Sequence, residues 1–208
     1  MKATIYAIHA DTIRRMDWTP LRERMPGRMA KADRYRLERD RLLCMGAGLL
    51  MLRFAGIRDE SQLRQGKNGK PFAPGYPAFN LSHSGQWCVL AMGEGEIGVD
   101  IERIDPKNLE VAPTVYTSGE LEWMSGSPLE RFHTLWTWKE SVMKATGQGM
   151  ALEPGSFEVL PFAAGKPIEV DGKRLFAASG ALEGYRYSVC AARPIDRLEW
   201  AEWKGDGL

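Results

Sequence analysis

The sequence predicts an α+β protein in which helices are mixed with antiparallel hairpins. Three observations support this fold class. Of the 208 residues, 44% are hydrophobic and 26% are charged, which is typical of a globular chain and excludes a disordered chain or a coiled-coil rod. Two segments, 30–54 and 128–146, have helical patterns, whereas several short apolar segments have the character of strands. The 22 glycines and 12 prolines provide turns between them.

The N-terminal part is expected to form a strand and then helices. Residues 4–8 alternate in polarity, which predicts a short strand. Residues 30–54 contain no proline, and we expect one long helix or two, ending near Gly56. The apolar run 42–52 within this segment has 11 residues, well short of the roughly 20 that span a bilayer.

The middle of the chain is expected to form a turn followed by strands. Residues 66–71, Gly-Lys-Asn-Gly-Lys-Pro, have the composition of a turn. Residues 79–81 and 87–92 are expected to be strands. The Gly-Glu-Gly-Glu segment 93–96 predicts a hairpin turn, from which the chain returns as a strand over 97–104.

The C-terminal part is expected to contain helices and then strands. A helix is expected to start at Thr117 or Ser118. A longer one covers 128–146, with a proline in its first turn and Gly147 as its stop signal. The strands expected after these helices are 157–160, 168–170, 175–177 and 185–191.

Charge is distributed unevenly, although the net charge is only +1. Residues 22–41 contain eight basic and four acidic residues, whereas residues 94–130 contain nine acidic and two basic ones. This asymmetry suits a protein that binds a polyanion through a metal, and a solvated helix face with i, i+4 pairs is the alternative. A net charge of +1 excludes a polycation that coats nucleic acid.

The cysteines predict a reduced compartment. Cys44, Cys88 and Cys190 lie far apart, without the C-x-x-C spacing of zinc or redox sites, so we expect buried thiols. An odd cysteine count, and no apolar leader or membrane span in the sequence, predict a cytoplasmic protein.

Two carboxylates share one face of the strand expected at 97–104. Because side chains alternate along a strand, Gly98, Asp100 and Glu102 point one way. Neighbouring carboxylates repel unless a cation lies between them, and oxygen ligands favour Mg²⁺ or Mn²⁺. Gly98 would let a ligand approach closely. An ordinary polar strand face is the alternative.

The helix expected at 128–146 has an unusual charge pattern. At 100° per residue, His133, Thr137, Glu140 and Lys144 share one face, and the alternative for Glu140 and Lys144 is a surface salt bridge. Lys139 falls on the apolar side, so it must extend to solvent or find an anion. Two lysines flanking one carboxylate suit a phosphate held through a metal. The aromatic residues of this helix are expected to pack: Phe132, Trp136 and Trp138.

Three segments together resemble a known family. They are Phe79-Asn-Leu-Ser-His-Ser-Gly, Ile97-Gly-Val-Asp-Ile-Glu, and the pattern Phe132-x-x-Leu-Trp-x-x-Lys-Glu-Ser-x-x-Lys. In order and approximate spacing they are similar to the three motif blocks of the Sfp-type 4'-phosphopantetheinyl transferases, which Gly69-Lys-Pro also matches. His83, at a polar strand end, is an ordinary structural histidine in the alternative interpretation.

The resemblance implies a pseudo-dimer of two similar α+β halves, 1–104 and 105–208, with the active site at their junction. It also implies an enzyme, a holo-carrier-protein synthase. Such an enzyme moves the 4'-phosphopantetheine arm of coenzyme A to a serine of an apo acyl, peptidyl or aryl carrier protein and releases 3',5'-ADP. Fatty-acid, polyketide and nonribosomal peptide biosynthesis are all compatible pathways. We expect a monomer without nucleic-acid or membrane partners.

The resemblance also implies site residues. Asp100, Glu102 and Glu140 are the expected ligands of Mg²⁺ or Mn²⁺. Glu140 and Lys144 are the expected catalytic residues: Glu140 takes the serine proton, with Glu120 or water as alternatives, and Lys144 meets the pyrophosphate. The residues expected to bind coenzyme A are Arg28, Lys31, Arg41, Lys70, Pro71, Ser82, His83 and Lys144.

Two other functions are compatible with the same residues. One is a different Mg²⁺-dependent enzyme acting on nucleotide pyrophosphates, which would release no arm to a protein. The other is a non-catalytic module in which the basic segment 22–41 binds nucleic acid or an acidic partner, without Mg²⁺ and with a steep dependence on salt.

Overall fold

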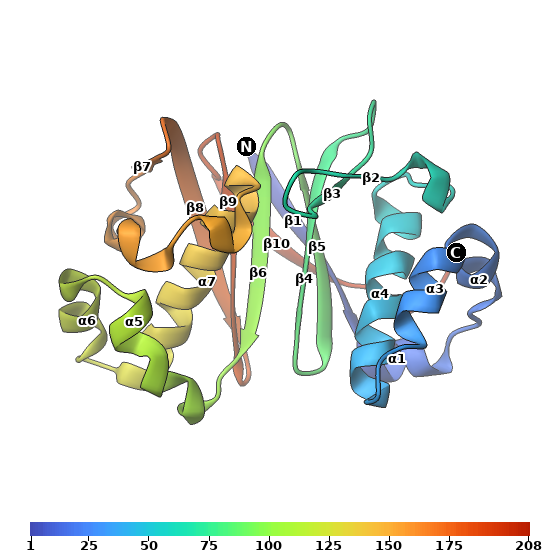
Figure 1. Cartoon of the computed structure of the whole chain (residues 1–208), viewed down its shortest axis with the longest axis horizontal. Helices are drawn as coiled ribbons and strands as arrows, with labels where there is room; N and C mark the ends of the chain where they lie inside the picture. The colour runs from blue at the N-terminus through green and yellow to red at the C-terminus, as the bar shows by residue number, and fades with distance from the viewer.

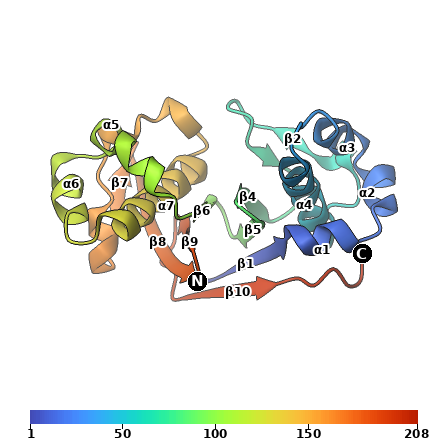
Figure 2. The ribbon, with the colours of Figure 1, turned by 90° about the horizontal axis from the view of Figure 1, so that it is seen from below.

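The computed structural model describes all residues 1–208, and two four-stranded sheets form its centre, with helices on the outer side of each (Figures 1 and 2). The strands are β1 (Lys2–His9), β2 (Arg64–Gln65), β3 (Pro71–Phe72), β4 (Ala78–Ser84), β5 (Trp87–Gly93), β6 (Ile97–Arg103), β7 (Ile168–Val170), β8 (Lys173–Leu182), β9 (Tyr185–Ala191) and β10 (Arg197–Glu202). The helices are α1 (Ala10–Arg15), α2 (Thr19–Arg24), α3 (Pro26–Ala32), α4 (Glu38–Phe54), α5 (Ala112–Val115), α6 (Ser118–Met124) and α7 (Pro128–Thr146). The predicted α+β class is confirmed.

The first sheet has the strand order β10-β1-β5-β4, and the second has the order β6-β9-β8-β7. Three hydrophobic clusters hold this arrangement together. Helices α1–α4 bury one cluster against the first sheet, and α7 buries another against the second. The third cluster lies where the two sheets pack on each other. No helix has the length and apolar character that crossing a membrane requires.

The N-terminal expectations agree with the structure. The strand expected at 4–8 lies within β1, and the helical segment 30–54 forms two helices, α3 and α4. Helix α4 is buried on most sides because it packs on β5 and against α1–α3. Gly46 permits this contact, since a Cβ there would lie 2.6 Å from Ile13 Cδ1.

The hairpin expected at 93–96 is wrong. β5 already has β1 and β4 as its two neighbours, so β6 leaves the first sheet and pairs with β9 in the second. An alternating pattern identifies a strand but not its partner, and a Gly-rich connection can join two sheets as well as two paired strands.

Strands β4 and β6 lie side by side at the junction of the sheets but are joined by side chains instead of a backbone ladder. Three alternate residues of β4 point toward β6. Asn80 Oδ1 accepts a hydrogen bond from Val99 N–H at 2.9 Å, and Ser84 Oγ accepts one from Arg103 N–H at 3.0 Å. Ser82, between them, donates to a carboxylate of β6. This polar seam is the floor of the candidate site.

Helix α7 packs directly on β6 at Gly98. A Cβ at Gly98 would lie 2.0 Å from the carbonyl oxygen of Ser141 and 2.5 Å from the nitrogen of Ala145. The expectation that Gly98 admits a ligand is therefore wrong, because the missing side chain admits the backbone of α7. The close approach places the carboxylates of β6 beneath the polar side chains of α7.

The strand expected at 157–160 is also wrong, because buried side chains satisfy this backbone in place of a neighbouring strand. Phe157 C=O accepts from Lys139 Nζ at 2.6 Å, and Val159 N–H donates to Glu120 Oε1 at 2.8 Å. The helix expected at Thr117 or Ser118 is confirmed: Thr117 is the N-cap of α6, and Glu120 completes its capping box.

The two sheets exchange segments of the chain. β6 lies within residues 1–104 but belongs to the second sheet, and β10 lies within 105–208 but pairs in parallel with β1. The sheets therefore do not coincide with these two ranges. The division of the chain into two similar halves stays a prediction.

Candidate active site

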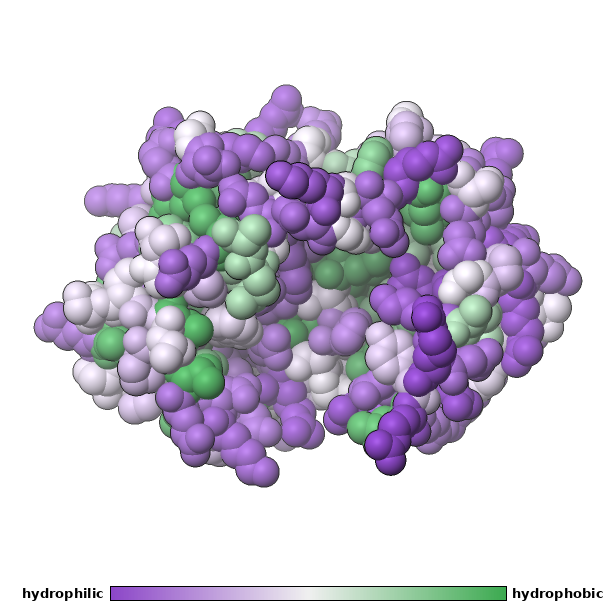
Figure 3. Space-filling model, in the orientation of Figure 1, coloured by the Kyte–Doolittle hydropathy of each residue, from purple (hydrophilic) through white to green (hydrophobic).

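A cavity of about 460 Å³ lies between helices α3 and α4 on one side and α7 on the other. The space-filling view is hollowed along this line, and the rim is mainly hydrophilic (Figure 3). A larger, open depression of about 840 Å³ beside Lys2 and Arg193 contains none of the expected site residues. Those that line the 460 Å³ cavity are Arg28, Lys31, Pro71, Ser82, His83, Asp100, Glu102, Glu140 and Lys144.

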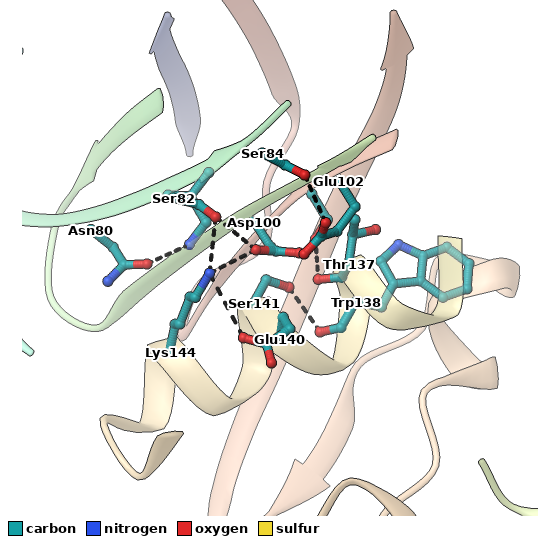
Figure 4. Close-up of polar contacts among 12 residues, drawn as sticks. Asn80, Ser82, Ser84, Asp100, Glu102, Thr137, Trp138, Glu140, Ser141 and Lys144 are labelled. Carbon is teal, nitrogen blue, oxygen red and sulfur yellow. Dashed lines mark hydrogen bonds and ion pairs between the residues drawn. The ribbon is translucent and has the colours of Figure 1, made fainter. Parts of the chain in front are cut away.

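Lys144 and Asp100 form the centre of the site (Figure 4). Lys144 Nζ lies 2.6 Å from Asp100 Oδ1 and donates to Ser82 Oγ at 3.0 Å. Ser82 Oγ in turn donates to the same Asp100 oxygen at 2.8 Å. The Asp100 side chain is 2% exposed, whereas that of Lys144 is 24% exposed. The ammonium is thus fixed in position and still accessible from the cavity.

Glu140 lies one helical turn before Lys144 and faces the same ammonium. Its Oε2 is 3.7 Å from Lys144 Nζ. Burial raises the pKa of Glu140 above its usual 4.5, while the attraction of Lys144 acts against this shift. Burial also lowers the pKa of Lys144, but Asp100 and Glu140 raise it more, so the lysine holds its proton more firmly than usual.

Glu102 is held by a hydroxyl of the polar seam. Ser84 Oγ donates to Glu102 Oε2 at 2.9 Å while accepting from Arg103 N–H. Burial raises the pKa of Glu102 to about 7, and repulsion from Asp100 adds to the shift, whereas the Ser84 bond opposes it. Asp100 and Glu102 thus lie on one face of β6, as the alternation along 97–104 predicted, and they are close enough to repel each other.

The carboxylates offer a site for a divalent cation, but they do not surround one point. No three His, Cys, Asp or Glu side chains in the structure are arranged to hold a metal ion. Asp100 Oδ2, however, is buried without any hydrogen-bond partner. This free oxygen, with Glu102 and Glu140 nearby, supplies the oxygen donors that Mg²⁺ and Mn²⁺ prefer. The donor chemistry fits, and the metal stays a prediction.

The expected coenzyme-binding cations lie in different places. Arg28 and Lys31 lie on α3 at the cavity wall, and neither has a carboxylate partner within salt-bridge distance. Arg41 is exposed and is not among the residues that line the cavity. Lys70 lines a smaller neighbouring cavity of about 220 Å³, where its ammonium meets two backbone carbonyls.

His83 lies on β4 between the two serines of the seam, exposed on the cavity side. It also lines an adjacent cavity of about 280 Å³ near Arg39 and Asn108. The surrounding protein, and then the charge of Lys144, lower the pKa of His83 below its usual 6.5. As a neutral ring it donates a hydrogen bond at one nitrogen and accepts one at the other.

Lys139 does not belong to this site. Its ammonium points away into the core, where it lies 2.9 Å from Glu120 Oε2, and both side chains are 0% exposed. The expectation that two lysines flank one carboxylate is therefore wrong. Glu120 is also excluded as a base in the cavity, because its oxygens already serve Lys139, Thr117 N–H and Val159 N–H.

Sequence reasoning missed several residues of the site, among them Asn80, Ser84 and Trp136. Asn80 and Ser84 build the seam, and their spacing of two from Ser82 on a predicted strand was a usable signal. Trp136 lines the cavity, although its helix pattern indicated packing alone. Its spacing was a usable signal, because Trp136 lies one turn before Glu140 and so is on the side of the helix that carries Glu140 and Lys144.

Comparison with known proteins identifies the family. The family model described as "4'-phosphopantetheinyl transferase superfamily" matches residues 96–190. This range includes β6 and α7, which carry the four charged residues at the centre of the site.

Three curated relatives are similar over much of the chain. The 4'-phosphopantetheinyl transferase AcpT of Escherichia coli (strain K12) is 44% identical over 153 residues, which cover 66% of this chain and 71% of the relative. The 4'-phosphopantetheinyl transferase Sfp of Bacillus subtilis (strain 168) is 35% identical over 136 residues, 61% of each chain. The 4'-phosphopantetheinyl transferase gsp of Aneurinibacillus migulanus is 32% identical over 155 residues, 68% of this chain and 63% of the relative. The chain spans less than two thirds of the length of the last two relatives. Its similarity to all three shows that it belongs to the Sfp-type 4'-phosphopantetheinyl transferase family.

Proposed function

We propose that this chain transfers the 4'-phosphopantetheine arm of coenzyme A to a serine hydroxyl of an apo carrier protein and releases 3',5'-ADP. The observation that supports this most is the distribution of charge across one cavity. Arg28 and Lys31 lie on one wall, and Lys144 lies on the other beside two carboxylates. A substrate with separated phosphates needs cations at separate points, which this cavity provides.

Arg28 and Lys31 would bind the 3'-phosphate of coenzyme A, and His83 a further phosphate oxygen. A charge-assisted bond of this kind contributes roughly 1.5–3 kcal/mol. We therefore expect wild type to bind dephospho-coenzyme A more weakly than coenzyme A, and we expect this difference in affinity to be smaller in Lys31→Met, which keeps Arg28. Arg24→Met is the matched control, because Arg24 is exposed on α2 and does not line the cavity. Equal affinity of wild type for both compounds would contradict this role.

The bond to form joins the serine oxygen to the phosphorus that carries the pantetheine arm. The bond to break joins this phosphorus to the bridging oxygen, which leaves with the electron pair as part of 3',5'-ADP. Glu140 would accept the serine proton. Lys144, held in place by Asp100 and Ser82 before the substrate arrives, would neutralise the charge that develops on the leaving phosphate.

Asp100, Glu102 and Glu140 would hold Mg²⁺, or Mn²⁺. When bound, such an ion supplies a Lewis acid that neutralises pyrophosphate charge. We expect Asp100→Asn, Glu102→Gln and Glu140→Gln each to abolish transfer. A ligand that binds only the folded state raises stability, so Mg²⁺ should raise the melting temperature of wild type and not that of Asp100→Asn. Glu110→Gln, an exposed carboxylate away from the cavity, is the control.

We also propose that the protein acts as a cytoplasmic monomer with no nucleic-acid or membrane partner. The three free, buried cysteines support a reducing compartment. Size-exclusion chromatography with light scattering tests the monomer, and a dimer that persists on dilution would contradict it.

The decisive experiment incubates the protein with coenzyme A, Mg²⁺ and several apo carrier proteins. We expect one carrier to gain the mass of one phosphopantetheine arm, with the gain lost when its acceptor serine is replaced by alanine. Release of 3',5'-ADP without any carrier would instead indicate a pyrophosphatase. Binding of coenzyme A without either product would indicate a non-catalytic module.

A further inference from the structure

The Gly66–Lys70 turn, which joins β2 to β3, makes a contact across the cavity to the end of helix α7. The turn is closed by its own backbone, since Gly66 N–H donates to Lys70 C=O and Gly69 N–H donates to Gly66 C=O, each at 2.9 Å. From this compact turn, Asn68 Nδ2 donates to Gly147 C=O at 2.9 Å. This bond joins the β2–β3 hairpin to the end of α7.

Lys70 makes the central contact of this connection. Its Nζ donates to Lys144 C=O at 2.6 Å and to Ile97 C=O at 2.8 Å. One partner lies in the last turn of α7 and the other at the start of β6. A single ammonium therefore joins the turn, the helix that carries Lys144 and the strand that carries Asp100.

The backbone alone gives Lys144 C=O one long hydrogen bond, from Gly147 N–H at 3.3 Å. The last four C=O groups of an α-helix have no partner within the helix, and a cation near them interacts favourably with the helix dipole. Helix α7 ends at Gly147 in the left-handed conformation, with φ of 74°. From a segment about 75 residues earlier in the chain, Lys70 adds a charged donor to Lys144 C=O, and Asn68 supplies a donor to Gly147 C=O.

The environment of the Lys70 ammonium is unusual for a positive charge, because no carboxylate lies within salt-bridge distance of it. Burial lowers the pKa of Lys70 to about 8, although Glu96 attracts the charge and opposes the shift. An ammonium whose hydrogen bonds are only to carbonyls is costly to bury. Lys67, in the same turn, is exposed and makes no side-chain contact of this kind.

We propose that Lys70 is a positioning residue for the transfer reaction, in place of a direct contact to coenzyme A. It holds the last turn of α7 and the start of β6 together, and so fixes the Lys144 ammonium against Asp100. This inference rests on the proposed transferase function. Its physical basis is preorganisation, because a displacement of about 1 Å at a charge-stabilising group can cost about 10²-fold in rate.

The kinetic test compares four variants with coenzyme A and with dephospho-coenzyme A. We expect Lys70→Met to lower kcat on the order of tenfold, with KM for coenzyme A within about threefold of wild type. Lys70→Arg should recover most of kcat, because its fork can reach both carbonyls. Asn68→Ala should show a smaller loss, and Lys67→Met should behave as wild type. A raised KM for coenzyme A, but not for dephospho-coenzyme A, would show a direct phosphate contact and overturn the proposal.

A second measurement needs no substrate and separates this proposal from the proposed function. Hydrogen exchange of the amides at 144–148 should be faster in Lys70→Met and Asn68→Ala than in wild type and Lys67→Met, because the end of α7 opens locally. Unchanged exchange there would overturn the positioning role. If wild type transfers no arm to any carrier, the proposed function fails, whereas the exchange result still decides whether Lys70 holds the helix.

Discussion

Helix α7 carries two lysines that meet two buried carboxylates, and the two pairs differ in how completely they are satisfied. Lys139 and Glu120 are both fully buried, and every charged atom has a partner within the protein. The pair joins α7 to α6 and to the segment after Glu153. No charged atom of this pair is therefore free to bind a ligand.

Lys144 and Asp100 form a closer but incomplete pair. Asp100 Oδ2 is buried without a partner, and Lys144 is accessible from the cavity. Burying a polar group without a partner costs free energy, so such a group points to a function more strongly than a satisfied ion pair does. The comparison teaches that burial and charge alone do not identify the site. The unsatisfied atom and the access to solvent do.

The largest expected effect on stability follows the loss of the Lys139–Glu120 pair, in which every charged atom has a partner. Lys139→Met leaves Glu120 charged and buried without its main partner, which costs about 3–5 kcal/mol of unfolding free energy. The double variant Lys139→Met with Glu120→Leu should recover much of this loss, because both charges are gone. Urea unfolding measures the stability. Transfer per folded molecule should be nearly normal, and a large loss of rate in the folded double variant would contradict a purely structural role.

Loss of the Lys144–Asp100 pair should differ from this by a large loss of transfer rate. Lys144→Met should lower the transfer rate about 10²–10³-fold, since a preorganised charge at the leaving phosphate is removed. It should also lower stability, because Asp100 is buried, whereas an exposed i, i+4 pair would cost only about 0.2–1 kcal/mol. Lys144→Arg should recover the rate only in part. Lys107→Met, an exposed lysine without a partner, is the control, and a near-normal rate for Lys144→Met would remove α7 from the chemistry.

The Lys144–Asp100 pair depends on Gly98, where α7 packs closely on β6. Gly98→Ala would place a methyl group 2.0 Å from a backbone oxygen of α7. The helix must then shift, and we expect a cost of about 2–3 kcal/mol, near the upper end for overpacking. Gly155→Ala is the control, since a Cβ there meets nothing nearer than 3.8 Å. Thermal unfolding checks both, and equal stability of the two variants would contradict the close packing.

The smallest expected effect concerns a third buried group of α7, His133. Its Nε2 accepts from Asp105 N–H at 3.1 Å and its Nδ1 lies 2.8 Å from Leu129 C=O, an arrangement that suits the neutral ring. Burial lowers the pKa of His133 below its usual 6.5. The unfolded chain then binds the proton more readily than the folded one.

The contribution of His133 to stability should therefore be fully present above pH 6.5 and decrease as the pH falls below it, by at most about 1.4 kcal/mol per pH unit for one proton. The measurement is the free energy of unfolding in urea between pH 7.5 and 5.5. His133→Gln should have a flatter dependence on pH than wild type. The same slope in both proteins would mean that His133 does not carry this proton.

Periodicity in the sequence predicted much of the site. The alternation along 97–104 placed Asp100 and Glu102 on one face, and the helical spacing placed Glu140 and Lys144 one turn apart. Both predictions depend only on local backbone geometry. The same reasoning found that Lys139 needs an anion, but it could not name Glu120, which lies 19 residues earlier on another helix.

Local reasoning failed where the partner of a segment decides its structure. The segment 157–160 has strand-like residues, yet Lys139 and Glu120 take its backbone hydrogen bonds. The 93–96 segment resembles a hairpin turn, yet β5 already has two neighbours. Gly98 suggested access for a ligand, and the structure places a helix there.

The sequence by itself determined the α+β class, the main strands and helices, and the face on which each charged side chain lies, because period and turn chemistry are local properties. The tertiary structure decided which faces meet. It placed α7 on β6 so that Lys144 reaches Asp100, sent Lys139 to Glu120, and brought Lys70 to the end of α7. These contacts join segments that are far apart in the chain, and they depend on how the sheets and helices pack together.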